Sequence, residues 1–227
     1  MFFDPMYFMF ILPAFLLGLW AQMRIQIAYT QAQRRAAPLS GAAAARHILD
    51  SAGLQNVAIE QIPGKLSDHY DSRAKVLRLS QEVYQSRTLA AVGIAAHESG
   101  HAIQDAVAYS PLKMRNAIVP MAGIGSNAGM LMVILGAFLG MNGFLIWLGI
   151  GLFSCVVVFQ LVNLPVEYNA SNRAKSQLVQ LGIIRDQELV YVKKVLNAAA
   201  LTYVAATLQA IMTLLYLIMR FGGNSRD

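Results

Sequence analysis

The sequence predicts a mainly α-helical membrane protein with about four transmembrane helices and a small cytoplasmic α+β domain. Of its 227 residues, 56% are hydrophobic and 13% are charged, whereas an average soluble domain has about 45–50% and about 25%. Three long stretches contain no Lys, Arg, Asp or Glu: residues 6–22, 116–164 and 198–219. Polar and charged residues gather between these stretches, which is the pattern of alternating lipid-embedded and water-exposed segments.

Composition also excludes several classes of protein. The charge is too low and the hydrophobic content too high for a disordered chain. Cys155 is the only cysteine, so a disulfide-stapled secreted domain is excluded. The net charge of +6 would suit a nucleic-acid binder, but the sequence contains none of the motifs of one. We therefore expect no nucleic-acid partner.

The charge-free stretches are long enough to form four spans. Residues 6–22 form the first, since about 17–25 apolar residues cross a bilayer; the preceding MFFDP lacks the basic residues of a cleaved signal peptide. Residues 116–164 suit two spans joined by a turn near 141–143, and residues 198–219 form the fourth. Gly136 and Gly140 have the GxxxG spacing that lets membrane helices approach closely.

Residues 23–115 have the composition of a soluble domain. Residues 42–53 read as a helix closed by Gly53. Residues 56–62 and 74–80 are rich in β-branched residues and alternate, which predicts two short strands, and residues 63–73 between them are typical of a turn. Residues 87–108 have helical character. A second polar segment, residues 165–197, also has a helical pattern, and Pro165 is placed as at the start of a helix.

The basic residues orient the chain. Residues 23–115 contain eleven Lys and Arg and residues 164–197 contain five, whereas the turn near 141 contains none. The positive-inside rule therefore places both polar segments in the cytoplasm. Both termini then face outward.

The sequence HESGH at residues 97–101 is the HExxH zinc signature. On a helix, His97 and His101 project from nearly the same face, so both imidazoles can reach one metal ion. Glu98 is rotated away from that line, so it can act as general base toward water activated by the metal. The small, apolar flanks predict a buried helix, on which these polar side chains need partners.

A catalytic zinc site usually has three protein ligands and one open position. The sequence leaves the third ligand open among His47, His69, Asp105 and a carboxylate further along the chain. Asp105 is better placed to hydrogen-bond a ligand histidine than to reach the metal. His69 lies in a turn-rich segment, where it is either structural or lines the site. Glu167 is the only Asp or Glu between Asp105 and Asp186, and it lies beside a predicted span on the same side as HESGH.

The combination of DHYDSR, KVLRLS, AAHESGHAIQDA and LPVEYNASNRA resembles the YugP-like family of bacterial membrane zinc metallopeptidases, over nearly the whole chain. The resemblance implies a zincin-like peptidase domain of the gluzincin type. It implies His97, His101 and Glu167 as ligands of one Zn²⁺ per chain, with Glu98 as catalytic base. It also implies an inner-membrane location.

The segment around Glu167 also resembles an ExxxD pattern of other membrane peptidases, in which the Asp contacts a ligand histidine. Here that position is Ser171, and Asn169 lies between. Ser171, Asn169, Asp105 and His69 are therefore the candidates for supporting the ligands.

Two functions are compatible with these residues. The first is a membrane-anchored zinc endopeptidase, with membrane lipid around it and membrane proteins or extended peptides as substrates; the strand at residues 74–80 could pair with such a substrate. The second is a non-catalytic zinc-binding scaffold, which needs a fourth protein ligand with His69 as the donor.

Overall fold

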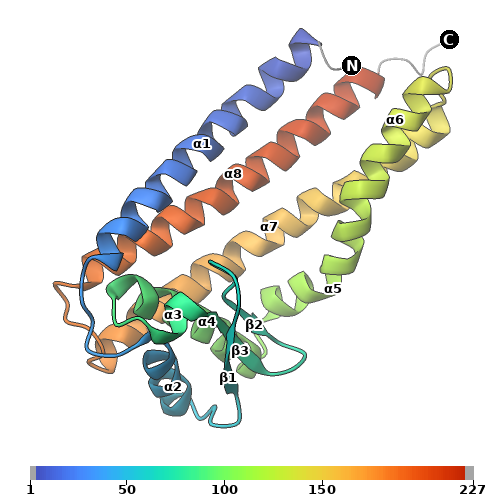
Figure 1. The fold of residues 1–227 in the computed structure, drawn as a ribbon. Helices are drawn as coiled ribbons and strands as arrows, with labels where there is room; N and C mark the ends of the chain where they lie inside the picture. Colours follow the sequence, from blue (N-terminus) through green and yellow to red (C-terminus); the bar gives the residue numbers. More distant parts are fainter. Residues whose placement is uncertain (1–3, 223–227) are drawn as a thin grey trace. The chain divides into compact units, whose positions relative to one another are not determined.

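A computed structural model describes residues 4–222, and it divides the chain into two compact units. Among these residues, the first unit comprises 4–20, 113–165 and 201–222, and the second comprises 21–112 and 166–200. Figure 1 shows long helices together with a small group of short strands and helices. The predicted fold class is confirmed in its main terms, which are a mainly helical chain with four long apolar helices and a small sheet.

Four helical segments among the described residues are long and apolar enough to cross a membrane. They are α1 (Pro5–Gln33), α5 to α6 (Ser110–Phe138), α7 (Gly143–Gln180) and α8 (Leu189–Gly222). The charge-free stretches lie in these segments, apart from residues 139–142 between α6 and α7, and the helices extend beyond the stretches.

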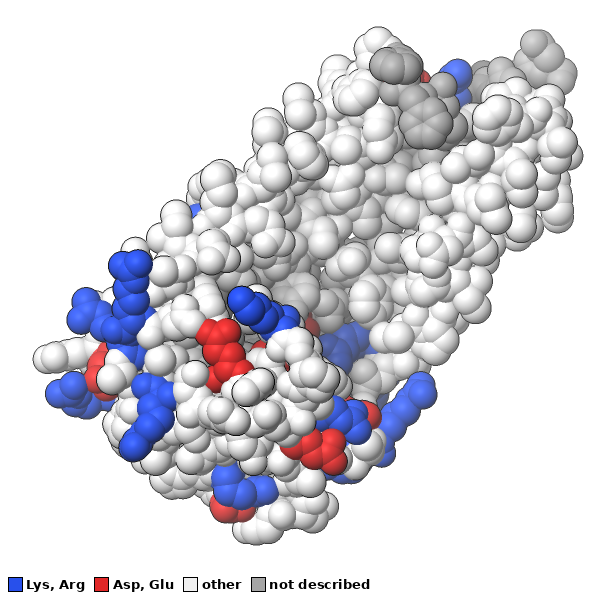
Figure 2. Space-filling model, in the orientation of Figure 1, with Lys and Arg blue, Asp and Glu red and all other residues white. Residues whose placement is uncertain are grey.

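The first unit packs parts of all four segments around one apolar core. Its buried residues include Val133, Ile150 and Tyr216. Large apolar side chains also face outward, such as Phe138, which is 82% exposed, and Phe144, which is 75% exposed. The helices of this unit show almost no charged side chains in Figure 2, except near their ends. An apolar outer surface of this kind suits lipid rather than water.

The second of these four segments is not a uniform α-helix. α5 (Ser110–Ile124) passes through a π-helical turn at Gly125–Gly129 before α6 (Met130–Phe138). A Cβ at Gly125 would lie 2.3 Å from the carbonyl oxygen of Leu152, and one at Gly129 would lie 2.9 Å from the amide nitrogen of Phe153. These two glycines therefore let the segment approach α7 closely.

The prediction that Gly136 and Gly140 both allow a close approach of helices is wrong for Gly140. This residue follows the end of α6, has a φ of +72°, and a Cβ there would meet nothing within 4 Å. It forms the turn rather than a helix contact, because glycine adopts positive φ without strain. The turn thus begins before the predicted residues 141–143.

The second unit contains the sheet and the shorter helices. α2 (Gly41–Ser51) precedes β1 (Ala58–Ile62), β2 (His69–Asp71) and β3 (Val76–Ser80), and α3 (Gln81–Gln85) precedes α4 (Leu89–Ala106). The sheet order is β1-β3-β2, with β1 parallel and β2 antiparallel to β3. Two strands are those predicted, whereas β2 lies in the segment predicted as a turn.

Two apolar clusters meet at α4. One joins the helix to α2 and the sheet through Leu49, Leu77 and Ala95. The other joins it to α1, α7 and α8 through Val92, Ala96 and Leu178. The many alanines of α4 favour the helix and leave room for neighbours on both sides. The helix that carries HESGH is therefore the centre of this unit.

The expectation that a helix begins at Pro165 is wrong. Pro165 lies inside α7, which continues from Gly143 to Gln180. Proline is tolerated within membrane helices because neighbouring groups can satisfy the freed carbonyl. Pro165 also marks the boundary between the two units, so Glu167 and the rest of α7 belong to the second unit.

Candidate metal centre

His97 and His101 lie one turn apart on α4, with ring centroids 4.8 Å apart and ring planes at 82°. The helix begins at Leu89, and the Thr88 side chain accepts a hydrogen bond from the amide of Ala91. His101 is 6% exposed and His97 is half-buried. The two rings thus lie against each other and are largely shielded from solvent.

Glu167 of α7 meets the two histidines. Its Oε2 lies 3.2 Å from Nε2 of His97 and 3.7 Å from Nε2 of His101. One ligand atom from each of the three residues lies within 4.8 Å of the other two. Residues about 70 apart in the sequence therefore bring three metal-binding donors to one point.

A glycine sets the spacing of the two helices here. A Cβ at Gly100 would lie 2.7 Å from the carbonyl oxygen of Ala170 on α7. Glu167, Ala170 and Ser171 share one face of α7, because residues three and four apart lie on the same side of a helix. The close contact at Gly100 thus places this face against the histidines.

The electrostatics of the three donors suit a cation. Glu167 is 5% exposed. Burial alone would raise its pKa, but hydrogen bonds and charge from His101 and His97 hold the pKa of this carboxyl well below its usual value. The carboxylate is therefore the stable form and needs positive charge beside it. Two imidazoles and one carboxylate form a donor set that zinc takes in catalytic sites, so these residues fit a zinc ion.

Gln104 fixes the orientation of His101. Its side chain is fully buried, and its Oε1 lies 2.9 Å from Nδ1 of His101. Its Nε2 donates to the carbonyl of Val166 at 2.8 Å and to Oδ1 of Asn169 at 3.0 Å. Because the amide nitrogen is committed to these two acceptors, Oε1 accepts from His101, so Nδ1 of His101 carries the proton. Nε2, the ring nitrogen that faces Glu167, is then the one that would release its proton and bind a metal.

The other two candidates on α7 also lie at the site. Ser171 Oγ lies 3.1 Å from Nδ1 of His97. Asn169 Oδ1 accepts from Gln104 and, at 2.8 Å, from Nε of Arg173. Ser171 thus contacts His97 directly, and Asn169 reaches His101 through Gln104.

Asp105 and His69 are placed differently. Asp105 Oδ2 accepts a hydrogen bond of 2.8 Å from the Tyr70 hydroxyl and also pairs with Lys75. These contacts tie α4 to β2 and the turn after it, so the contact predicted between Asp105 and a ligand histidine is replaced by that of Gln104. His69 is exposed on β2, where its Nδ1 lies 2.8 Å from the carbonyl oxygen of Ser67. Neither residue joins the donor cluster found among residues 4–222.

Sequence reasoning missed Gln104, although a signal was present. An amide three residues after a ligand histidine lies on the same helix face. Asp105, four residues after it, satisfies the same rule, and its carboxylate makes it the stronger candidate from the sequence alone. Only the contacts of Asp105 distinguish it from Gln104 as a partner of His101. Its carboxylate is bound by Tyr70 and Lys75, which come from another part of the chain.

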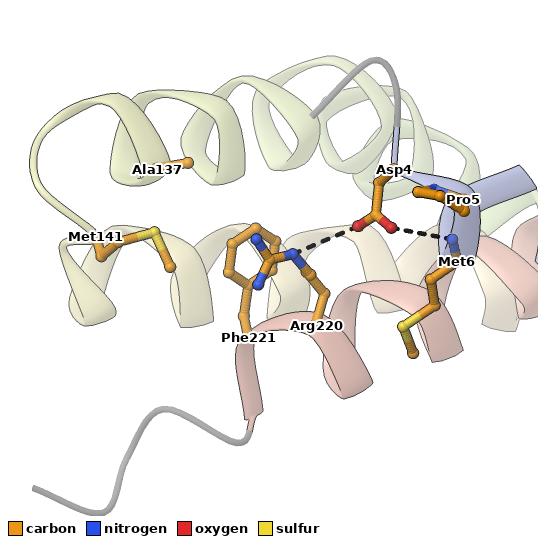
Figure 3. Close-up of a pocket in the computed structure, with 7 residues that line it drawn as sticks. All are labelled: Asp4, Pro5, Met6, Ala137, Met141, Arg220 and Phe221. Carbon is orange, nitrogen blue, oxygen red and sulfur yellow. Dashed lines mark hydrogen bonds and ion pairs between the residues drawn. The ribbon is translucent and has the colours of Figure 1, made fainter.

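A separate cavity lies in the first unit (Figure 3). It has a volume of about 710 Å³ and is lined by Asp4, Met6, Met141, Arg220 and others. Asp4 accepts from the Met6 amide at 3.0 Å and lies 3.5 Å from Arg220. Its carboxylate is already balanced by these groups, and the lining of the cavity contains none of the three donors His97, His101 and Glu167.

The fold and the site thus define a helical protein with a largely buried His/His/Glu cluster that could hold a metal ion. The chain belongs to a family described as "Putative neutral zinc metallopeptidase", which matches residues 7–222. It is also 45% identical over 213 residues to "Putative membrane protease YugP" of Bacillus subtilis (strain 168), covering 93% of this chain and 94% of that protein. No solved structure matches it. The resemblance seen in the sequence is confirmed, and the matches together with the four long apolar helices indicate a membrane protein.

Proposed function

We propose that this protein is a zinc-dependent endopeptidase embedded in a bacterial cell membrane by four spans. His97, His101 and Glu167 hold one zinc ion, and Glu98 is the general base. The observation that carries this proposal is the convergence of the three donors from α4 and α7. The family and its relative support it through their names, which describe a zinc metallopeptidase and a membrane protease.

The chemistry divides between the metal and Glu98. A zinc ion in this site would polarise the scissile carbonyl and lower the pKa of water toward about 7. Glu98 is half-buried beside His97, and its carboxylate accepts the proton of the attacking water. The same group then returns the proton to the leaving amine. Gln104 and Ser171 hold the two imidazoles in their binding orientation throughout.

The substrate is an extended peptide segment near the membrane. The strand predicted at residues 74–80 to pair with it corresponds to β3, but β3 lies in the middle of the sheet and is paired on both sides. We assign this role to β2 instead. It is an edge strand, and the hydrogen bond from Tyr70 to Asp105 joins it to α4. An edge strand offers unpaired backbone groups to an extended chain.

A scaffold with structural zinc is less well supported. Such a site is closed by four protein ligands, and the cluster among the described residues has three. The expected fourth donor, His69, is exposed and bonds Ser67. The geometry therefore favours an open position for water and substrate.

The test compares the purified protein with Glu98→Gln. Glutamine fills the same space but cannot accept the proton. Zinc content should be unchanged, and cleavage of an unstructured protein substrate should fall at least about 10²-fold, the low end for a general base. Equal cleavage by Glu98→Gln would remove Glu98 from the mechanism.

A further inference from the structure

A basic groove lies between the end of α1 and the beginning of α8, within the second unit. It consists of two cavities, of about 190 and 400 Å³, which share Gln31 and Lys194 in their walls. Figure 2 shows Lys and Arg side chains gathered in this region, where α1 ends and α8 begins in Figure 1. The other residues that line the groove are Arg24, Ile27, Ala28, Arg34, Arg35, Tyr191 and Ala198.

The groove is built from one face of each helix. Arg24, Ala28 and Gln31 follow each other at intervals of four and three residues on α1, and Tyr191, Lys194 and Ala198 at intervals of three and four on α8. Residues at this spacing share one helix face. The two faces are therefore opposed.

The charged side chains that line the groove are all positive. Four cationic side chains line it and no Asp or Glu does. Tyr191 holds two of them in place: the Arg35 guanidinium lies 4.9 Å from its ring centroid and the Lys194 ammonium 5.8 Å, both within cation–π range. Like charges held together repel each other, so an anion entering the groove would relieve this repulsion.

The groove also has an apolar wall. Ala28 and Ala198 line it and are buried, while Ile27 is 59% exposed. In the sequence, Arg24 follows the charge-free residues 6–22 by two positions, and Lys194 precedes the charge-free residues 198–219 by four. A ligand here would combine a negative head with an apolar body at the level where both helices enter the membrane.

We propose that this groove binds the headgroup of an anionic phospholipid. Arginine and lysine bind phosphate oxygens through charge-assisted hydrogen bonds, and the cytoplasmic leaflet supplies anionic lipids. The inference rests on the membrane spans of the proposed function and on the orientation predicted from the basic residues, but not on the peptidase chemistry. Its role would be to anchor α1 and α8, which pack on the same core as the α4 helix.

Neighbouring lysines on α8 provide a matched pair of variants. Lys193 and Lys194 are adjacent and both exposed, yet Lys194 lines the groove and Lys193 lines a different cavity with Lys175 and Asp186. General attraction to an anionic surface would treat the two lysines alike. A specific site would depend on Lys194 alone.

The experiment measures lipid binding to the full chain, purified in detergent, by native mass spectrometry with phosphatidylglycerol or phosphatidylcholine. We expect the wild type to prefer phosphatidylglycerol. Lys194→Gln and Arg24→Gln should each weaken its binding about fivefold, the effect of one cation near a lipid surface, and Lys193→Gln by less than about twofold. Millimolar inorganic phosphate should not displace the lipid.

Three results would overturn the inference: equal weakening by Lys193→Gln and Lys194→Gln, equal binding of the two lipids, or displacement by inorganic phosphate. Zinc content measured on the same samples separates the two proposals. A protein that shows the expected lipid pattern without binding zinc would refute the metallopeptidase and leave the lipid site standing.

Discussion

The Cβ that alanine would place at position 100 lies 2.7 Å from the carbonyl oxygen of Ala170. Gly100 is the second variable residue of HESGH, and Ala170 lies one turn after Glu167 on α7. A separation under 3.0 Å from a backbone atom cannot be tolerated without movement of a helix. This contact therefore controls how closely the two histidines approach the third donor.

Gly100→Ala should weaken both the fold and the metal site. Overpacking of this kind costs about 1–3 kcal/mol, and displacement of α7 separates Glu167 from the histidines. The expected result is a lower thermal midpoint and a lower zinc affinity. Gly151→Ala is the matched control, because it lies within α7 and its Cβ would meet nothing within 4 Å. Identical behaviour of the two variants would show that the contact at Gly100 does not set the spacing.

Gln104→Met should lower zinc affinity about 10–100-fold, as loss of a ligand's hydrogen-bond partner typically does. Methionine keeps the volume but cannot accept from Nδ1 of His101. Gln104→Glu keeps that acceptor and loses the donor to Val166 and Asn169, so its loss should be smaller. Chelator competition measures the affinity, and the absorption spectrum of the cobalt-substituted protein reports the ligand geometry.

The control for Gln104 is Ser99→Ala. Ser99 is also buried on α4, but its hydroxyl donates to the carbonyl of Ala95 in its own helix. Zinc affinity and the cobalt spectrum should remain those of the wild type in this variant. If Gln104→Met also left both unchanged, His101 would be oriented by something other than Gln104.

The predicted topology can be tested by cysteine labelling. In a Cys155→Ser background, Lys65→Cys should be protected from a membrane-impermeant maleimide in intact cells, whereas Gly143→Cys should react. Lys65 is exposed in the polar region, and a side chain at Gly143 meets nothing within 4 Å. Labelling of position 65 from outside would reverse the orientation given by the basic residues but would leave the metal site intact.

Much of the fold could be predicted because its signals are local. Absence of charge over residues 6–22, 116–164 and 198–219 is sufficient to predict helices long enough for a membrane. The ends of these helices could not be predicted in the same way. α7 continues through Pro165 because its continuation packs on α4, and that packing is not visible in composition.

The strand β2, which the sequence does not predict, shows a second limit of prediction from sequence. β2 is three residues long and contains Asp71, which favours turns, so the local sequence indicates a turn. It forms a strand because it pairs with β3, with Tyr70 opposite Leu77. This is a contact between segments that sequence periodicity does not encode.

The candidate site was predictable in part for a similar reason. HESGH is a local motif, whereas Glu167 was one of several open alternatives until the resemblance singled it out. The hydrogen bonds of Gln104 and Ser171 link α4 to α7 across more than 60 residues. Only the folded arrangement shows which polar residue contacts which histidine.

Zinc binding by Glu167→Ala tests the central claim most directly. Wild type and His69→Ala, measured by elemental analysis after dialysis, should each hold about one zinc per chain. Glu167→Ala should lose more affinity than the about 10–100-fold expected for a hydrogen-bond partner, because only two protein ligands remain. Full zinc occupancy in Glu167→Ala together with loss in His69→Ala would contradict the account.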